Sequence, residues 1–369
     1  MFPFFSYSLS LFVSFLTFFS LSLLLLSSPC FPARLSPGTL TFNSATVLSV
    51  NDINGINDIN ATWHHFERFL DTARGSHVSG LSELKKYFHG FGYLVVPDTN
   101  FTETFDNRFE SAVIHYQSKL GLPVTGKLNS DTLSQIMLPR CGMSDTHVIH
   151  TTRHFAYFPG EPRWTRLTPI SLSYAFSPDN MIRYLSLSDI RAVFERAFTR
   201  WAAVIPVSFY ETEYYDTADI KIGFYSGDHG DGQPFDGILG VLAHAFSPES
   251  GMFHIDAAER WAVDFGTEKS KVAVDLESVV THEIGHVLGL GHSSVKEAIM
   301  YPSLIPRTKK VELKVDDVEG VQALYGSNPN FRISSLLASE TSINQAVGSR
   351  TRTSKWPTTL LLLILCFCI

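Results

Sequence analysis

Three histidines and one glutamate stand at fixed spacing in residues 282–292, which read HEIGHVLGLGH. His282 and His286 are four residues apart, so on a helix both imidazoles lie on one face. The glycine-rich turn that follows lets His292 return to the same point. Three neutral imidazoles can hold zinc and leave one position open for a water, whose pKa the metal lowers. Glu283, beside the first of these ligands, is placed to take the proton of that water.

The alternative is a helix whose histidines are simply satisfied in the protein core. The short string HExxH can occur by chance, but here the full string HExxHxxGxxH is followed by Ile299, Met300, Tyr301 and Pro302. This combination is far more specific. The sequence therefore predicts a catalytic zinc site with Glu283 as the general base.

A second group of metal-binding side chains occupies the loop that precedes this helix. Three histidines and one aspartate could fill all four positions of a structural zinc site: His229, Asp231, His244 and His254. Three further carboxylates, with carbonyl groups of the glycine-rich turn, offer the oxygen ligands that calcium prefers: Asp236, Asp256 and Glu259. The alternative is a loop whose charges are only solvated.

Cysteine usage singles out one thiol. Of the four cysteines, Cys30, Cys366 and Cys368 lie at or inside terminal segments that resemble removable signals, so only Cys141 belongs to a predicted folded region. A lone thiol in a secreted chain indicates an intermolecular disulfide, an inert core position or a bond to a metal.

With these motifs in view, the chain resembles a matrix metalloproteinase (matrixin) of the compact plant type, over about residues 63–326. The resemblance implies catalytic zinc on His282, His286 and His292, and structural zinc on His229, Asp231, His244 and His254. It implies calcium at Asp236, Gly237, Leu239, Val241, Asp256 and Glu259. Residues 139–145, PRCGMSD, look like the family's cysteine switch, in which the thiolate of Cys141 fills the open zinc position. An inert cysteine is the alternative.

The resemblance also implies how a peptide substrate would bind. An edge strand would hold it by main-chain hydrogen bonds, and a specificity pocket would lie between the zinc helix and the wall at 301–304. The residues expected at these places are Ala243, Ala245, Ser278, Val279, Pro302 and Leu304. Met300 would form the floor under the zinc ligands. Loop 303–313 has its own sequence, so the depth of the pocket stays open.

The hydrophobic patterns predict the elements that position these groups. The zinc helix is expected at about 276–288, capped by Asp275 and ended by Gly289. Two further helices are expected, one over 189–201 with Ser188 as its cap and one over 315–325. Strands are expected at 171–176, 207–210 and 219–224. With the resemblance, these predict an α+β catalytic domain, 155–326, with a twisted, mostly parallel sheet and three helices.

Upstream, apolar residues at helical spacing predict three short helices within 63–116 that share one core. This part resembles the helical peptidoglycan-binding-like module, 63–138, which would pack rather than bind glycan; glycan binding is the alternative. Residues 31–154 would form a propeptide. Because 141–155 contains no dibasic run, another protease or self-cleavage would remove it. Phe155 would become the mature terminus, with its ammonium paired to Asp316.

The two ends of the sequence predict targeting signals. Residues 1–30 resemble a signal peptide, with an uncleaved anchor as the alternative. Residues 327–348 would be a linker, and 349–369 resemble a glycolipid (GPI) anchor signal, with a marginal transmembrane helix as the alternative. Asn60 and Asn100 stand in Asn-x-Thr sequons and are candidate glycosylation sites. The expected location is the outer face of the plasma membrane.

The net charge of −7 comes with no basic cluster beyond Arg307, Lys309 and Lys310, so nucleic-acid binding is not indicated. The predicted function is that of a latent, monomeric zinc endopeptidase that cleaves extracellular or cell-surface proteins. No hemopexin-like propeller follows Gly326, and unwinding of triple-helical collagen is not expected. The alternatives are another Met-turn metalloprotease and a catalytically retired surface-binding protein on a protease scaffold. The retained base and zinc ligands argue against the retired scaffold.

Overall fold

The computed structural model describes residues 63–146, 149–150, 154–332, 334 and 336, all within the second of two units, Asp58–Ile369. The predicted signal peptide 1–30, the sequon at Asn60 and the predicted anchor signal 349–369 lie outside the described residues. These three remain predictions. Among the described residues, a search for a helix long and apolar enough to cross a membrane found none.

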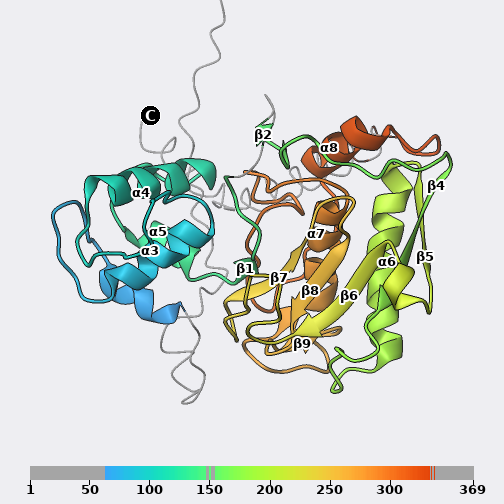
Figure 1. The fold of residues 1–369 in the computed structure, drawn as a ribbon, viewed down its shortest axis with the longest axis horizontal. Coiled ribbons are helices and arrows are strands. Elements are labelled where there is room, and N and C mark those ends of the chain that lie inside the picture. The colour runs from blue at the N-terminus through green and yellow to red at the C-terminus, as the bar shows by residue number, and fades with distance from the viewer. Residues whose placement is uncertain (1–62, 147–148, 151–153, 333, 335, 337–369) are drawn as a thin grey trace, which may run out of the picture. The chain divides into compact units, whose positions relative to one another are not determined.

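A six-stranded sheet carries the candidate site, with the strand order β1-β7-β8-β6-β4-β5 (Figure 1). Its strands are β1 (Arg140–Cys141), β4 (Ile170–Phe176), β5 (Val207–Glu211), β6 (Ile220–Tyr225), β7 (Val241–Ala245) and β8 (Met252–Asp256). Strand β7 runs antiparallel to β8, and every other pair of neighbours in this sheet is parallel. The predicted α+β fold with a mostly parallel sheet is confirmed.

Three helices accompany this sheet, as expected: α6 (Leu187–Val204), α7 (Leu276–Val287) and α8 (Val315–Tyr325). The prediction that Ser188 caps α6 is wrong. The cap is Ser186, whose Oγ accepts a hydrogen bond from the Asp189 main-chain N–H at 3.1 Å. The Ser186 hydroxyl also bonds the Asp189 carboxylate at 2.6 Å, so the helix begins two residues earlier.

Helix α7 is buried along its whole length. Its cap is the expected Asp275, which accepts from the Ser278 N–H at 2.8 Å. A side chain at position 285 would overlap Met300 Sδ, which explains why this turn of the helix carries glycine. The helix ends before Gly289, whose φ of +103° lies in the left-handed region where glycine is favoured.

The upstream module consists of short helices around one apolar core. They are η1 (His64–Phe69), α3 (Leu81–Gly90), α4 (Asn107–Lys119) and α5 (Ser130–Ile136). The first expected helix is a 3₁₀ helix, and Leu70 at its end is exposed. Helix α5, capped by Asn129, was not predicted. The core is largely aromatic and includes Phe66, Phe69, Phe88, Phe105, Phe109 and Tyr116.

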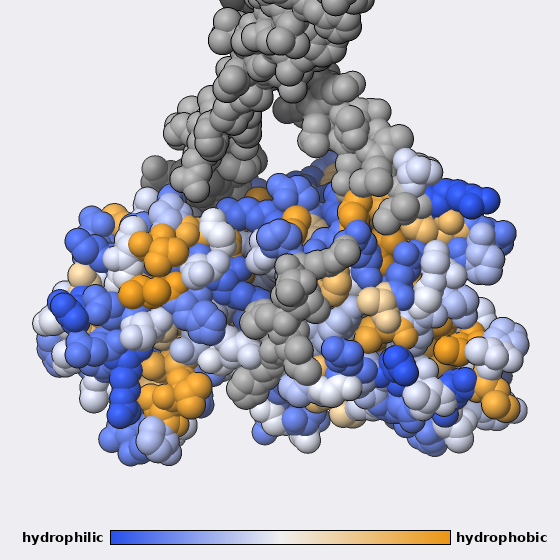
Figure 2. Space-filling model, turned by 90° about the horizontal axis from the view of Figure 1, so that it is seen from above, coloured by the Kyte–Doolittle hydropathy of each residue, from blue (hydrophilic) through white to orange (hydrophobic). Residues whose placement is uncertain are grey.

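Short elements complete the described structure: η2 (Tyr215–Thr217), β2 (Ile149–His150) with β3 (Ala156–Tyr157), and β9 (Trp261–Ala262) with β10 (Val274–Asp275). On the face seen in Figure 2, hydrophobic residues of the described part form small separate patches in a mostly hydrophilic surface. Single patches of this kind are normal on folded proteins.

Candidate metal centres

The three histidines of the first motif converge on one point. His282 and His286 project from successive turns of α7, and His292 follows the turn that begins at Gly289. The Nε2 atom of His286 lies 3.1 Å from Nε2 of His282 and 3.2 Å from Nε2 of His292. Such a separation matches the edges of a tetrahedron around a zinc ion with bonds of about 2.0–2.1 Å.

The other ring nitrogen of each histidine is held by an acceptor. His282 Nδ1 lies 2.7 Å from the Ile299 carbonyl oxygen, and His286 Nδ1 lies 2.7 Å from that of Leu290. His292 Nδ1 lies 2.6 Å from Asp145 Oδ1. When Nδ1 donates its proton to these acceptors, each Nε2 lone pair is free and faces the other two.

Burial also keeps these rings neutral. Desolvation lowers the pKa of His282 and of His286 well below the usual range, and the neighbouring imidazoles lower it further. Desolvation lowers the pKa of His292 as well, against the influence of Asp145. Zinc binds the neutral form of imidazole, so this donor set fits the metal that the sequence predicted.

Cys141 completes the first group from the upstream segment. Its Sγ lies 3.4 Å from His286 Nε2, and the ligand atoms of Cys141, His282, His286 and His292 all lie within 4.8 Å of one another. Burial, and then the nearby Glu283 carboxylate, raise the pKa of the Cys141 thiol well above its usual range. A divalent cation among the imidazoles would act in the opposite direction and favour the thiolate.

The segment around Cys141 is held as an extra strand. The Arg140 N–H donates to the Gly240 carbonyl at 3.0 Å, and the Gly142 N–H donates to that of Ala243 at 2.8 Å, along β7. On the other side, the Cys141 N–H donates to the Pro302 carbonyl at 2.8 Å. The upstream chain therefore occupies the edge of β7 that was expected to hold an extended substrate.

An ion pair that the sequence analysis did not identify locks this segment. Asp145 accepts from Arg140 Nη2 at 2.7 Å and from the Tyr93 hydroxyl at 2.6 Å, in addition to its contact with His292. The Arg140 and Asp145 side chains are fully buried, and the guanidinium stacks 3.7 Å from the ring centroid of Phe91. Although burial opposes its ionisation, Arg140 and then His292 hold the pKa of Asp145 well below its usual range.

Glu283 is fully buried beside the three imidazoles. Among the described residues, neither of its carboxylate oxygens has a hydrogen-bond partner. Desolvation raises the pKa of Glu283 to about 8. A buried carboxylate without a partner is costly, and one next to a metal centre is typical of a group kept for chemistry.

The second histidine group also converges. Asp231 Oδ2 lies 2.9 Å from His229 Nε2, 2.7 Å from His244 Nε2 and 2.8 Å from His254 Nδ1, so all four predicted ligands meet. His244 on β7 is paired directly with His254 on β8. Burial lowers the pKa of His244 to about 4. Neutral imidazoles around one carboxylate fit a structural zinc site with no open position.

The predicted calcium ligands come together in part. The Leu239 N–H donates to Glu259 Oε1 at 2.7 Å, the Gly237 N–H to Asp256 Oδ2 at 3.3 Å, and the Val241 N–H to Asp236 Oδ1 at 2.7 Å. Burial raises the pKa of Asp256 to about 6 and that of Glu259 well above its usual range, and the carboxylates raise one another's further. Calcium would neutralise this cluster of like charges. The carbonyl ligands at 237, 239 and 241 remain predictions.

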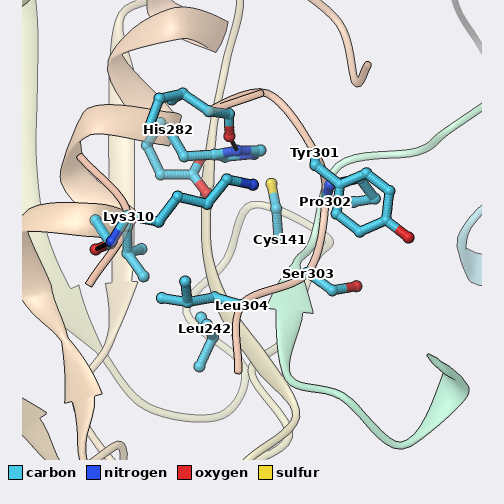
Figure 3. Close-up of a pocket in the computed structure, with 12 residues that line it drawn as sticks. Cys141, Leu242, His282, Tyr301, Pro302, Ser303, Leu304 and Lys310 are labelled. Atoms are coloured by element: carbon cyan, nitrogen blue, oxygen red, sulfur yellow. Dashed lines mark hydrogen bonds between the residues drawn. The ribbon is translucent and has the colours of Figure 1, made fainter. Parts of the chain in front are cut away.

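A pocket opens beside Cys141 and Glu283 (Figure 3). Four of the six residues predicted to contact substrate line it: Ser278, Val279, Pro302 and Leu304. Ala243 contributes its carbonyl to the β7 edge, whereas Ala245 pairs with Phe253 in β8 and does not line the pocket. Leu242 and Lys310, which were not among the predicted contacts, also line the pocket. Successive side chains of a strand point to opposite faces, so the side chain of Leu242 in β7 points away from that of Ala243. This alternation could have indicated that Leu242 lines the pocket.

The sequence of this chain is similar to those of known proteins. The family model described as matrixin matches residues 163–326, and that described as a putative peptidoglycan binding domain matches 78–136. Metalloendoproteinase 4-MMP of Arabidopsis thaliana is 61% identical over 294 residues, 78% of this chain and 85% of the relative. Metalloendoproteinase 1-MMP of the same plant is 53% identical over 327 residues, 87% and 88% of the two chains. Human matrilysin is 36% identical over 230 residues, 61% and 80%.

Proposed function

This chain belongs to the matrixin family, and we propose that it is made as a latent protease whose active centre Cys141 blocks until the upstream segment is removed. The chain is a zinc metalloendopeptidase with zinc and calcium as cofactors. The observation that carries the proposal is the convergence of three neutral imidazoles with the Cys141 sulfur, next to the unpartnered carboxylate of Glu283. We assign the catalytic zinc to His282, His286 and His292.

The residues of this chain divide the work of peptide hydrolysis among them. When bound, zinc supplies a Lewis acid that polarises the peptide carbonyl and lowers the pKa of a water molecule. Glu283 takes a proton from the attacking water and delivers it to the leaving amine. The edge of β7 holds the peptide in an extended form through main-chain groups such as the Ala243 carbonyl, which now binds Gly142. Because water attacks the peptide carbonyl directly, no acyl-enzyme forms.

We propose the same kind of assignment for the second centre. His229, Asp231, His244 and His254 hold a structural zinc, and the carboxylates of Asp236, Asp256 and Glu259 hold calcium. The zinc site would tie the loop 226–240 to strands β7 and β8, and the calcium site would tie it to β8 and the turn after it. Among the residues that the structure describes, no disulfide ties this loop to the sheet, because Cys141, the one cysteine in that part, is free.

The variant Glu283→Gln tests the proposed base. We expect its kcat for peptide cleavage, after removal of the upstream segment, to fall by about 10²–10⁴-fold, because general acid–base catalysis contributes that much. Zinc content, measured by atomic absorption, should stay that of the wild type, because the three imidazoles are unchanged. Glu213→Gln, at an exposed position, is the matched control. Equal cleavage by Glu283→Gln and wild type would contradict the role given to Glu283.

Secretion and attachment to the outer membrane surface are proposed from the sequence of 1–30 and 349–369 alone. Protein substrates of the cell surface fit this location. Treatment of intact cells with a phosphatidylinositol-specific phospholipase C should release the protease into the medium. Retention of the protease on the treated cells would reject the glycolipid anchor.

A further inference from the structure

Lys310 belongs to a basic cluster with Arg307 and Lys309 that has no part in the chemistry described so far, yet Lys310 lines the pocket beside Glu283. Figure 3 shows the Lys310 side chain extended across this pocket, from its own backbone toward His282. The remaining walls are mostly apolar and include Leu242 on β7 and Val279 on α7. Lys310 therefore adds a cationic side chain to a pocket whose other walls are mostly apolar.

Lys310 is fixed at both ends of its side chain. Its main-chain N–H donates to Ser278 Oγ at 2.7 Å, which ties its backbone to the first turn of α7. Its Nζ donates to the Lys296 carbonyl at 2.9 Å, on the loop that leads to Met300. The ammonium also lies 5.4 Å from the ring centroid of Tyr301. The alkyl stem between these two attachments crosses from one wall of the pocket to the other.

The residues before Lys310 hold the loop in place. Arg307 Nη1 donates to the carbonyl oxygens of Ser270 at 2.8 Å and Glu268 at 3.0 Å. Lys309 Nζ lies 2.9 Å from the buried carboxylate of Glu277. Arginine and lysine side chains are long and flexible on a free surface, but here Arg307 and Lys309 each bind acceptors that are fixed in the structure. The stem of Lys310 therefore starts from a fixed backbone.

We infer that Lys310 is a specificity-determining residue, whose stem closes the far end of the pocket and limits the substrate side chain next to the cleaved bond to medium-sized aliphatic groups. This inference rests on the proposed function. Because the ammonium donates to the Lys296 carbonyl, its charge is engaged there and the substrate meets the methylene groups of Lys310. Leucine or methionine fits such a pocket, a tryptophan side chain exceeds it, and a carboxylate would lose its hydration against apolar walls.

The test compares kcat/KM for three peptides that differ only at this position, with leucine, tryptophan or glutamate, after activation of the full-length protein. For wild type we expect leucine to be preferred. For Lys310→Ala the ratio of leucine to tryptophan should fall about tenfold or more, because a few methylene groups in a pocket change rates by that order. For Lys310→Met, which keeps the length and removes the charge, the ratio should stay within about twofold.

Two further variants keep the test decisive. Lys310→Leu also shortens the stem while it retains apolar packing, so it replaces the alanine variant if that one does not fold. Lys269→Met removes a charge at an exposed position outside the pocket, and its ratio should match wild type. An unchanged ratio in both short variants, an equal fall in Lys310→Met, or a wild-type preference for glutamate would each overturn the inference. Absence of cleavage of every peptide by wild type would contradict the proposed function instead.

Discussion

At the scale of single residues, the proposed latency depends on one sulfur atom, that of Cys141. Cys141 Sγ is the group from the upstream segment that reaches the three imidazoles. We expect full-length Cys141→Ser to cleave a peptide substrate without removal of residues 31–154, because a serine hydroxyl is a far weaker zinc ligand than a thiolate. Peptide cleavage by a sample shown intact by mass spectrometry is the measurement. Complete absence of cleavage by this variant would contradict the proposal that Cys141 blocks the active centre.

We expect the Asp145 carboxylate, through its contact with His292, to help hold the upstream segment on the catalytic centre. Asp145→Asn removes the charge that balances buried Arg140, a change that costs about 3–5 kcal/mol. We therefore expect the upstream segment to dissociate more readily, so that a thiol reagent modifies Cys141 at least tenfold faster than in wild type. Asp131→Asn, exposed on α5, is the matched control. Equal reaction rates for the two variants would show that the contact with Asp145 adds nothing to latency.

The sequence could predict the ligands of the catalytic centre because their spacing is local. His282 and His286 are one helical turn apart, and the glycine turn brings back His292 within six residues. Asp145 and Lys310 could not be found in this way, since each reaches the site from a loop far away in the chain. No periodicity relates such a loop to α7. Their roles became visible only when hydrogen bonds such as that from Lys310 to Ser278 were known.

At the scale of elements, α7 is held in place by one carboxylate in its first turn. Glu277 Oε2 lies 2.8 Å from Arg196 Nη2 on α6 and 2.9 Å from Lys309 Nζ, and Arg200 contacts its other oxygen. Burial favours the neutral acid, but these cations hold the pKa of Glu277 at about 2. Through this carboxylate, α6 and the pocket loop are tied to the zinc helix.

The stability of this junction should depend on pH with a definite sign. The folded pKa of Glu277 lies below its ordinary value of 4.5, so the stabilisation is complete above about pH 4.5 and is lost as the pH falls toward 2. At pH 7 we expect Glu277→Gln to lower the free energy of unfolding by about 2 kcal/mol, a value reduced for the exposure of Arg196 and Lys309. Urea unfolding of both proteins at several pH values should show this difference shrinking below pH 4.5. A difference independent of pH would contradict an ionic role.

Elements were predicted where residue types repeat along the sequence and missed where pairing alone defines them. The apolar stripe of α6 and the alternation of residue types in β4 are visible in the sequence. Strand β8 follows a turn with Pro248 and Gly251 and has no clear alternation of apolar and polar residues. Its hydrogen bonds to β6 and β7 make it a strand. The early start of α6 has a local cause, since Ser186 rather than Ser188 stands three residues before Asp189.

At the scale of the whole molecule, the upstream segment occupies the edge of β7 at which we propose that a peptide substrate binds. It adds β1 to the edge of β7, while Leu304 N–H donates to the Pro139 carbonyl at 3.1 Å from the opposite wall. Tyr301 of the catalytic part belongs to the apolar core of the helical module. Release of this segment would therefore break a strand pairing, the contact between Asp145 and His292 and an apolar contact, besides the proposed bond from Cys141 to zinc. Removal of the whole segment by proteolysis would break all four.

The proteolysis that frees the active centre should leave Phe155 as the new terminus. Phe155 is buried, and Asp316 on α8 accepts from Ser293, which follows the ligand His292, at 2.6 Å. Burial raises the pKa of Asp316, whereas the Phe155 main-chain N–H lowers it, so the two groups already lie close together. Cleavage before Phe155 would turn that N–H into an ammonium and pair it with the carboxylate.

Two measurements test this end state. Edman degradation of the active enzyme should begin at Phe155, and a start outside 150–158 would reject the proposed terminus. In the mature enzyme, Asp316→Asn should lower the midpoint of thermal unfolding by about 2–4 °C, as expected for the loss of about 1 kcal/mol from a protein of this size. Asp216→Asn, at an exposed position, is the control and should leave the midpoint unchanged. An equal midpoint for Asp316→Asn and wild type would mean that the new ammonium finds no partner there, and that the terminus is held by its buried phenyl ring alone.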